Sequence, residues 1–187
     1  PEFRENRFEF DVNFERRLGS IIRVEDIRCD LHMHTTETDG TETIEVMAAA
    51  CKARGYTHLA ITDHSKRVSM ARGLDATRVL AQWSKIDALN RSGQLGIAIF
   101  KGIECDILED GSMDLPSDVL AQADWVLASV HYGQRQSRQQ ITDRILNAIK
   151  HPYVTAIAHP TGRLIGKRDA YDVDLDAVIQ AAQEHGK

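Results

Sequence analysis

The chain has 187 residues, 42% of them hydrophobic, and its 28 acidic and 23 basic residues give a net charge of -5 at pH 7. This size and composition predict one globular domain with a hydrophobic core. The negative net charge argues against a domain that binds nucleic acid through its overall charge. The three cysteines have no CxxC spacing, no apolar stretch approaches a membrane span, and the amino end has no signal-peptide layout. We therefore expect a cytoplasmic protein without a membrane partner.

Residues 1–27 alternate charged and aromatic side chains without helix or strand periodicity, so we expect a lead-in that drapes on the domain or belongs to a preceding one. From residue 28 onward, apolar runs alternate with amphipathic stretches. Strands are expected at residues 28–34, 56–62, 97–107, 124–130 and 153–158, and helices at residues 41–54, 76–91, 116–121, 136–150 and 175–184. This alternation predicts an α/β domain over residues 28–187, either a parallel barrel or a doubly wound sheet.

The first expected strand ends with two histidines, His32 and His34, and Asp39 follows in the next turn. Residues i and i+2 of a strand share one face, so both imidazoles can reach one ion. Imidazole and carboxylate together suit Zn, Mn or Fe better than Ca. The alternative is a pair of surface histidines, with Asp39 capping the next helix and Glu42 completing a capping box. This motif alone does not decide between the two.

Other ionisable residues fall at the ends of the later strands: His64 after the second, Glu104 late in the third, and His131 and His159 after the fourth and fifth. The carboxyl ends of parallel strands meet at one face of a barrel, where active sites are built. The remaining histidines, which we interpret as structural or solvated, are His58, His151 and His185. The predicted metal ligands are therefore His32, His34, Asp39, His64, Glu104, His131 and His159.

Seven ligands are too many for a single ion that must keep a position open for substrate, so two or three divalent ions are expected. A carboxylate such as Glu104 can bridge a pair of ions, the arrangement used in two-metal hydrolysis of phosphate esters. We assign catalytic roles to Glu104, His131 and Arg163.

The loops after the same strand ends carry many basic residues: Lys66, Arg67, Arg72, Arg135, Arg138, Arg163, Lys167 and Arg168. The candidate ligands for phosphate or DNA among them are Lys66, Arg67, Arg135, Arg163 and Lys167. Arg163 is the strongest candidate, because its guanidinium fork fits two phosphate oxygens at once. The alternative is that these residues are ordinary solvated loop charges.

Five motifs, DLHMHT...TDG, AITDHS, GIECDI, ASVH and AHPTGR, resemble in order and wording those of the PHP (polymerase and histidinol phosphatase) domain. The chain looks most like the PHP domain at the carboxyl end of bacterial family X DNA polymerases. The resemblance implies a distorted parallel (β/α) barrel, up to three Mn, Zn or Fe ions, and 3′-5′ exonuclease activity on DNA next to a polymerase domain. The seven predicted ligands match family positions. The family's last strands, with a final Asp-x-His pair, have no counterpart here, so we expect an incomplete barrel and a fragment of a larger protein.

Three other functions are consistent with parts of this pattern. A small-molecule phosphatase of the histidinol-phosphatase type shares the metal motifs and would have a closed pocket rather than an open basic groove. A metal-dependent amidohydrolase also begins with HxH, but the position of Glu104 on the third strand and the arginine-rich loops disfavour it. A non-catalytic metal-binding structural module is the third.

Overall fold

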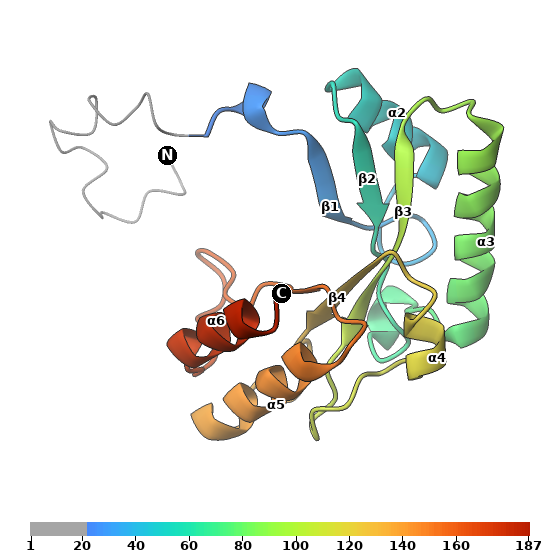
Figure 1. Ribbon diagram of the computed structural model, residues 1–187. Coiled ribbons are helices and arrows are strands. Elements are labelled where there is room, and N and C mark those ends of the chain that lie inside the picture. The colour runs from blue at the N-terminus through green and yellow to red at the C-terminus, as the bar shows by residue number, and fades with distance from the viewer. Residues whose placement is uncertain (1–21) are drawn as a thin grey trace, which may run out of the picture.

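In the computed structural model, which describes residues 22–187, five parallel strands form a curled half-barrel in the order β1-β2-β3-β4-β5 (Figure 1). The strands are β1 (Cys29–Met33), β2 (His58–Ile61), β3 (Ala98–Asp106), β4 (Trp125–Ser129) and β5 (Ala156–Ile157). The predicted parallel α/β architecture is confirmed. Most of the expected lead-in, residues 1–21, lies outside the described residues, and the domain boundary at residue 28 stays a prediction.

Four helices connect the described strands, namely α2 (Ile44–Ala53), α3 (Ala76–Ser92), α4 (Ser117–Leu120) and α5 (Arg138–Lys150), and α6 (Leu175–Glu184) follows β5. Figure 1 shows α2 and α3 beside the first three strands, and α5 and α6 side by side near β4. Two short 3-10 turns lie at Val24–Asp26 and Ser69–Ala71. Within residues 22–187, no helix is both long and apolar enough to cross a membrane.

Helix α2 begins three residues later than expected because Thr43 is its N-cap. The Thr43 side chain accepts a hydrogen bond from the backbone N–H of Val46 at 3.4 Å. An N-cap side chain satisfies an amide that has no partner inside the helix, which fixes where the helix starts. The alternative in which Asp39 and Glu42 form a capping box is therefore wrong, and Asp39 is available for another role.

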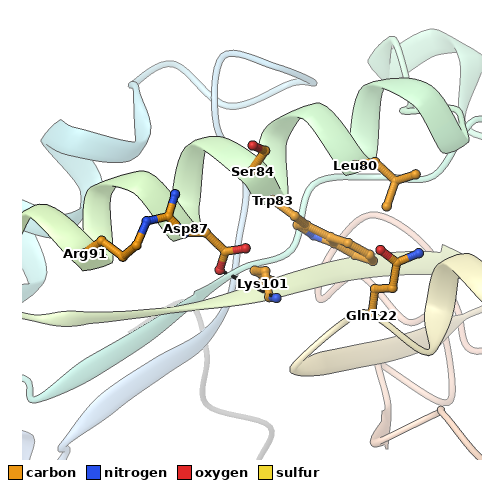
Figure 2. Close-up of a pocket in the computed structure, with 7 residues that line it drawn as sticks. All are labelled: Leu80, Trp83, Ser84, Asp87, Arg91, Lys101 and Gln122. Atoms are coloured by element: carbon orange, nitrogen blue, oxygen red, sulfur yellow. Dashed lines mark ion pairs between the residues drawn. The ribbon is translucent and has the colours of Figure 1, made fainter.

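The core lies between the sheet and the helices. Trp83 on α3 holds this helix against β3. Its indole N–H donates to the carbonyl oxygen of Gly102 at 2.9 Å. A side chain at Gly102 would come within 2.5 Å of the Ile61 carbonyl oxygen, so the strands and helix pack closely here. Beside Trp83, a cavity of about 270 Å³ contains an ion pair in which Lys101 Nζ is 3.5 Å from Asp87 Oδ1 (Figure 2). None of the predicted ligands lines it.

A bulge in β1 lies just before the predicted metal site. Asp30 pairs with Leu59 and Met33 with Ile61, so three steps along β1 match two along β2. The Thr62 hydroxyl fills the gap, accepting from the Met33 backbone N–H at 2.9 Å and donating to its carbonyl oxygen at 3.1 Å. Bulges re-aim the side chains next to them, and this one precedes His34.

Strand β5 is shorter than expected, but its ladder continues toward His159. The Thr155 N–H donates to the Val126 carbonyl oxygen and the Ala158 N–H to that of Ala128, each at 2.9 Å. The chain therefore runs alongside β4 up to the residue before His159, which places this histidine at the same edge of the sheet as the other strand ends.

Candidate metal centre

Glu104 lies at the centre of a histidine cluster at the carboxyl ends of the strands. Its side chain is only 1% exposed. Its Oε2 atom faces the amino-terminal strands, at 3.3 Å from His32 Nε2, 3.5 Å from His34 Nε2 and 3.0 Å from His64 Nδ1. The other carboxylate oxygen of Glu104, Oε1, has different neighbours, because it faces the strands nearer the carboxyl end.

The Oε1 atom of Glu104 faces the histidines that follow β4 and β5. It lies 3.4 Å from His131 Nε2 and 2.7 Å from His159 Nε2. One carboxylate therefore contacts imidazoles that come from both halves of the sheet, as a bridging ligand must.

Asp39 closes the other side of the cluster. Its Oδ1 atom lies 3.5 Å from His34 Nδ1 and its Oδ2 atom 3.4 Å from His64 Nε2. The structure therefore brings all seven predicted ligands together. The three histidines interpreted as structural or solvated lie elsewhere: His58 beside Phe100, His151 against Ser117, and His185 at the end of α6.

These atoms fit a metal centre. Three sets of ligand atoms each lie within 4.8 Å of one another, namely His32, Glu104 and His159; His34, Asp39 and His64; and His64, Glu104 and His131. Ligands that each lie about 2.0–2.2 Å from one ion are roughly 3.0–3.5 Å apart, close to the distances found here. The buried Nδ1 atom of His34 makes no hydrogen bond with the described residues. His64 belongs to two sets through opposite nitrogens, so as a neutral imidazole it can serve only one ion.

The electrostatics favour the metal-binding protonation states of Glu104 and His34. Burial would raise the pKa of Glu104, but hydrogen bonds from His159, His32 and His64 outweigh it and hold that pKa far below its usual range. Burial, followed by the neighbouring His64, lowers the pKa of His34. An ionised carboxylate and a neutral imidazole are the forms that coordinate divalent ions.

His64 behaves differently from His34. Burial would lower the pKa of His64, but its hydrogen bond and charge interaction with Glu104, and then the charge of Asp39, raise it. The backbone fixes this neighbourhood: the Glu104 N–H donates to the Asp63 carbonyl oxygen at 3.1 Å, and the Ser65 N–H donates to the Glu104 carbonyl oxygen at 3.0 Å. His64 and Glu104 are thus adjacent by strand pairing.

Two buried aspartates that the sequence did not single out as site residues hold the predicted ligands in place, and Asp63 is the first. It accepts hydrogen bonds from the Thr35 backbone N–H at 2.8 Å, the Thr35 hydroxyl at 2.6 Å and Gln82 Nε2 at 2.6 Å, and also from the Thr38 hydroxyl. These bonds pin the turn between His34 and Asp39. Asp63 therefore positions a predicted ligand without being in the cluster.

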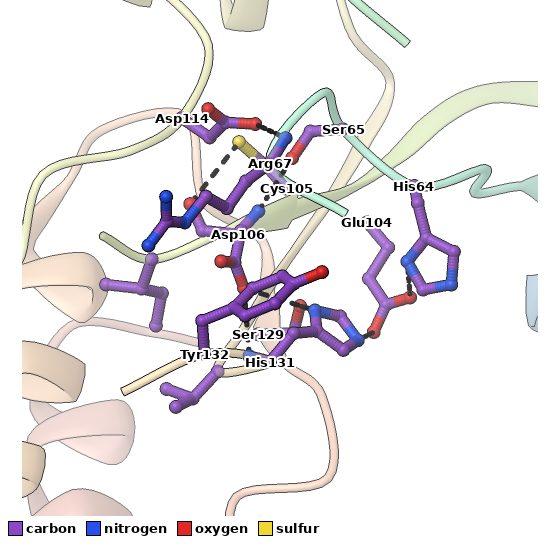
Figure 3. A network of polar contacts seen from close by, with 12 residues as sticks. His64, Ser65, Arg67, Glu104, Cys105, Asp106, Asp114, Ser129, His131 and Tyr132 are labelled. Atoms are coloured by element: carbon purple, nitrogen blue, oxygen red, sulfur yellow. Dashed lines mark hydrogen bonds and ion pairs between the residues drawn. The ribbon is translucent and has the colours of Figure 1, made fainter. Parts of the chain in front are cut away.

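Asp106 does the same for His131 (Figure 3). Its Oδ1 atom accepts from the His131 backbone N–H at 2.9 Å and lies 3.1 Å from His131 Nδ1. A carboxylate can only accept here, so Nδ1 carries the proton and the Nε2 lone pair faces Glu104. A carboxylate behind a ligating histidine is the usual way in which proteins orient that ligand. Since residues i and i+2 share a face, Asp106 could have been found from Glu104.

Arg144 on α5 joins the loops that follow β3 and β4. Its side chain is buried, with Nε donating to the Ile107 carbonyl oxygen at 2.9 Å and Nη1 to that of Tyr132 at 2.8 Å. Burial lowers the pKa of this guanidinium, and the charges of Asp106 and Glu109 oppose that shift. The loop that carries His131 is thus tied to the helix behind it.

Some of the basic residues have structural partners. Arg67 pairs with Glu109 and lies over the Tyr132 ring, 5.1 Å from its centroid. Three others also bind protein groups: Arg72 the carbonyl oxygens of Thr36 and Thr38 in the loop after β1, Arg138 the side chain of Asp174 before α6, and Arg168 the carbonyl oxygen of Gly162 in its own loop. The exposed basic residues among the predicted phosphate ligands are Lys66, Arg67, Arg135, Arg163 and Lys167.

Comparison with known proteins finds that residues 30–185 match the family model described as PHP domain. The chain is 43% identical over 184 residues to the DNA polymerase/3'-5' exonuclease PolX of Bacillus subtilis, covering 98% of this chain and 32% of that protein. It is 32% identical over 162 residues to a probable phosphatase of Acetivibrio thermocellus, covering 84% of this chain and 62% of that protein. A probable phosphatase of Thermoanaerobacter sp. is 32% identical over 166 residues, with coverage of 84% and 61%. The chain thus spans about a third of the first relative and about three fifths of the others.

Proposed function

The chain belongs to the PHP domain family, and on that premise we propose that it is a metal-dependent phosphoesterase that removes nucleotides from the 3′ end of DNA. The observation that carries the chemistry is Glu104, whose two oxygens face histidines from both halves of the sheet. The relative PolX, named as a 3'-5' exonuclease, supports DNA as the substrate. We propose residues 28–187 as the catalytic domain, working beside a polymerase domain in a longer chain.

The residues that would hold two or three Mn, Zn or Fe ions are those of the three ligand sets, with Glu104 shared between them. Such ions, when bound, polarise phosphoryl oxygens and lower the pKa of water toward neutrality. Asp106 keeps the Nε2 lone pair of His131 directed at the cluster. Arg163 lines the cavity next to His131 and His159, where its guanidinium can bind the oxygens of a phosphodiester.

Because the chain as a whole is acidic, binding DNA requires basic side chains concentrated near the cluster. The exposed basic residues on the loops around the cluster provide them, and bound divalent ions offset the carboxylates of the site. Lys66 and Arg67 follow β2, Arg135 follows β4, and Arg163 and Lys167 follow β5. We propose that these residues contact the backbone of a single strand or a 3′ end.

A small-molecule phosphatase is the second candidate, because two relatives are named as probable phosphatases. Both candidates use the same cluster and differ in what surrounds the reacting phosphate. A purely structural metal module is less well supported, since the seven predicted ligands lie close together and basic residues follow the same strands.

The test is hydrolysis of an end-labelled single-stranded oligonucleotide and of p-nitrophenyl phosphate by the protein, with and without added Mn²⁺. Glu104→Gln should lower both metal content and oligonucleotide hydrolysis by more than about a hundredfold, since a neutral amide is a poor bridging ligand. The control is His58→Gln, which changes a histidine outside the cluster.

Loss of activity in both variants to the same extent, with unchanged circular dichroism, would contradict the assignment of the site. Metal-dependent hydrolysis of p-nitrophenyl phosphate without any digestion of the oligonucleotide would favour the small-molecule phosphatase. Digestion that proceeds equally without metal would contradict both candidates.

A further inference from the structure

A small cavity opens beside the metal cluster, under the loop that follows β5. Its volume is about 250 Å³, and it is lined by Val130, His131, His159, Gly162, Arg163, Leu164 and Arg168. Most of its surface is apolar. Ligand pockets typically measure about 300–1,000 Å³, so this one has room for one ring system rather than a whole cofactor.

The loop that forms the cavity is folded on itself. The Leu164 N–H donates to the Arg168 carbonyl oxygen at 2.9 Å, and the Arg168 Nε and Nη2 atoms donate to the Gly162 carbonyl oxygen at 2.9 and 2.7 Å. Gly162 has a φ of +59°, and a side chain there would come within 2.5 Å of the Tyr171 ring. The wall of the cavity is therefore a defined turn held against a buried aromatic residue, which is a preformed binding surface.

The position of the cavity limits what can occupy it. His131 and His159 both line it, and both also contact Glu104 Oε1. Whatever fills the cavity is thus adjacent to the group that reacts at the cluster. For a DNA end, the group adjacent to the phosphodiester is the terminal nucleoside.

We propose that this cavity binds the base of the 3′-terminal nucleotide while its phosphodiester lies at the metal cluster. The inference rests on the proposed exonuclease function and adds the subsite that positions the terminal nucleotide. Apolar surface and arginine guanidinium planes suit the flat face of a base, and arginine also suits the neighbouring phosphate.

The same chemistry predicts little preference among the four bases. Stacking accepts every base, because each has a π-face, whereas discrimination needs fixed donors and acceptors along a base edge. The Nε and Nη2 atoms of Arg168 already donate to the carbonyl oxygen of Gly162, so they are not placed to read a base edge. Recognition therefore depends on the presence of a base rather than on its identity.

Leu164 and Ile165 provide a matched test. They are adjacent in the loop and are 49% and 48% exposed, but only Leu164 lines the cavity. Leu164→Asp and Ile165→Asp add the same charge at nearly the same place. Each variant is assayed on an oligonucleotide with a normal 3′-terminal nucleotide and on one whose terminal nucleotide is an abasic tetrahydrofuran. Leu164→Gln repeats the first change without charge, and circular dichroism confirms that each variant is folded.

We expect Leu164→Asp and Leu164→Gln to lower kcat/KM about tenfold to a hundredfold on the normal end, which is the range for loss of one stacked base. Hydrolysis of the abasic end should be unchanged, and Ile165→Asp should leave both substrates unaffected. Equal effects of Leu164→Asp on both ends, or equal effects of the two Asp variants, would overturn the proposal.

A binding measurement separates this proposal from the exonuclease function itself. Titration calorimetry with Mn²⁺-loaded protein compares thymidine 5′-monophosphate with inorganic phosphate. We expect the nucleotide to bind at least about tenfold more tightly, and this preference to disappear in Leu164→Asp. No preference in the unaltered protein would overturn the subsite even if DNA is digested. A Leu164-dependent preference without DNA digestion would overturn the exonuclease function and keep a nucleotide site.

Discussion

Replacing Asp106 with asparagine should weaken metal binding through His131 while leaving the fold intact. The Asp106 carboxylate accepts two hydrogen bonds from His131, one from the backbone N–H at 2.9 Å and one from Nδ1 at 3.1 Å. An asparagine side chain has nearly the same shape and keeps one acceptor oxygen. It loses the charge, and it can present an amide N–H to the ring.

The expected loss of metal affinity follows from the hydrogen bond between His131 Nδ1 and the side chain at position 106. A hydrogen bond to a charged acceptor contributes about 1.5–3 kcal/mol and a neutral one about 0.5–1.5 kcal/mol, so the Nδ1 bond weakens by about 1–1.5 kcal/mol. That difference corresponds to about tenfold, since about 1.4 kcal/mol is a factor of ten. It lies at the low end of the tenfold to hundredfold range for residues that orient a metal ligand.

The assay is Mn²⁺ affinity, measured by competition with a fluorescent chelator, together with the melting temperature of the metal-free protein. Asp143→Asn on α5 is the control, because Asp143 is an exposed aspartate that accepts a hydrogen bond only from Gln139 among the described residues. We expect about tenfold weaker metal binding for Asp106→Asn and no change for Asp143→Asn. Equal metal affinities in the two variants would refute the positioning role, and a melting temperature that falls with affinity would make the role structural.

Three further predictions concern buried groups. Asp63→Asn should lower the free energy of unfolding by about 1.5–3 kcal/mol in urea titrations, because four donors surround that carboxylate; an unchanged midpoint would contradict this. Burial raises the pKa of Tyr171 to about 12, so the unfolded state releases this proton at lower pH than the folded state, and the melting temperature should fall as pH rises from about 10 to 12. Tyr171→Phe should remove that fall, and an identical fall in this variant would contradict the assignment. Ellman's reagent at pH 8 should modify the half-buried Cys29 in the native protein but not the buried Cys51 and Cys105. Burial raises the pKa of the Cys105 thiol to about 12. Three reactive thiols before unfolding would contradict the packing.

The sequence predicted the strand ends well because parallel strands buried on both faces are continuous apolar runs. The third strand was expected at residues 97–107 and is Ala98–Asp106. The alternation of strands and helices then implied that the carboxyl ends share one edge. The same reasoning placed Glu104 and His131 near each other, although 27 residues separate them in the chain.

The supporting residues were harder to predict because their role depends on partners that only the folded chain brings close. Arg144 lies three residues after Ile141 and one before Ile145, on the buried face of α5. A charged residue on an apolar stripe is a signal, but its partners include the backbone carbonyl groups of Ile107 and Tyr132, which carry no sequence pattern. The bulge at Met33 depends likewise on the Thr62 hydroxyl, which strand periodicity does not predict.

The backbone of His159 has a consequence for how this protein can change under selection. Its φ of +29° lies in a region that non-glycine residues rarely adopt, and such conformations cost on the order of 1–3 kcal/mol. Glycine would relieve that strain but would remove an imidazole 2.7 Å from Glu104. Selection for thermal stability alone, without metal or substrate, should therefore favour glycine at this position and discard a predicted ligand. At this position the chain keeps a less stable backbone conformation together with an imidazole that contacts Glu104.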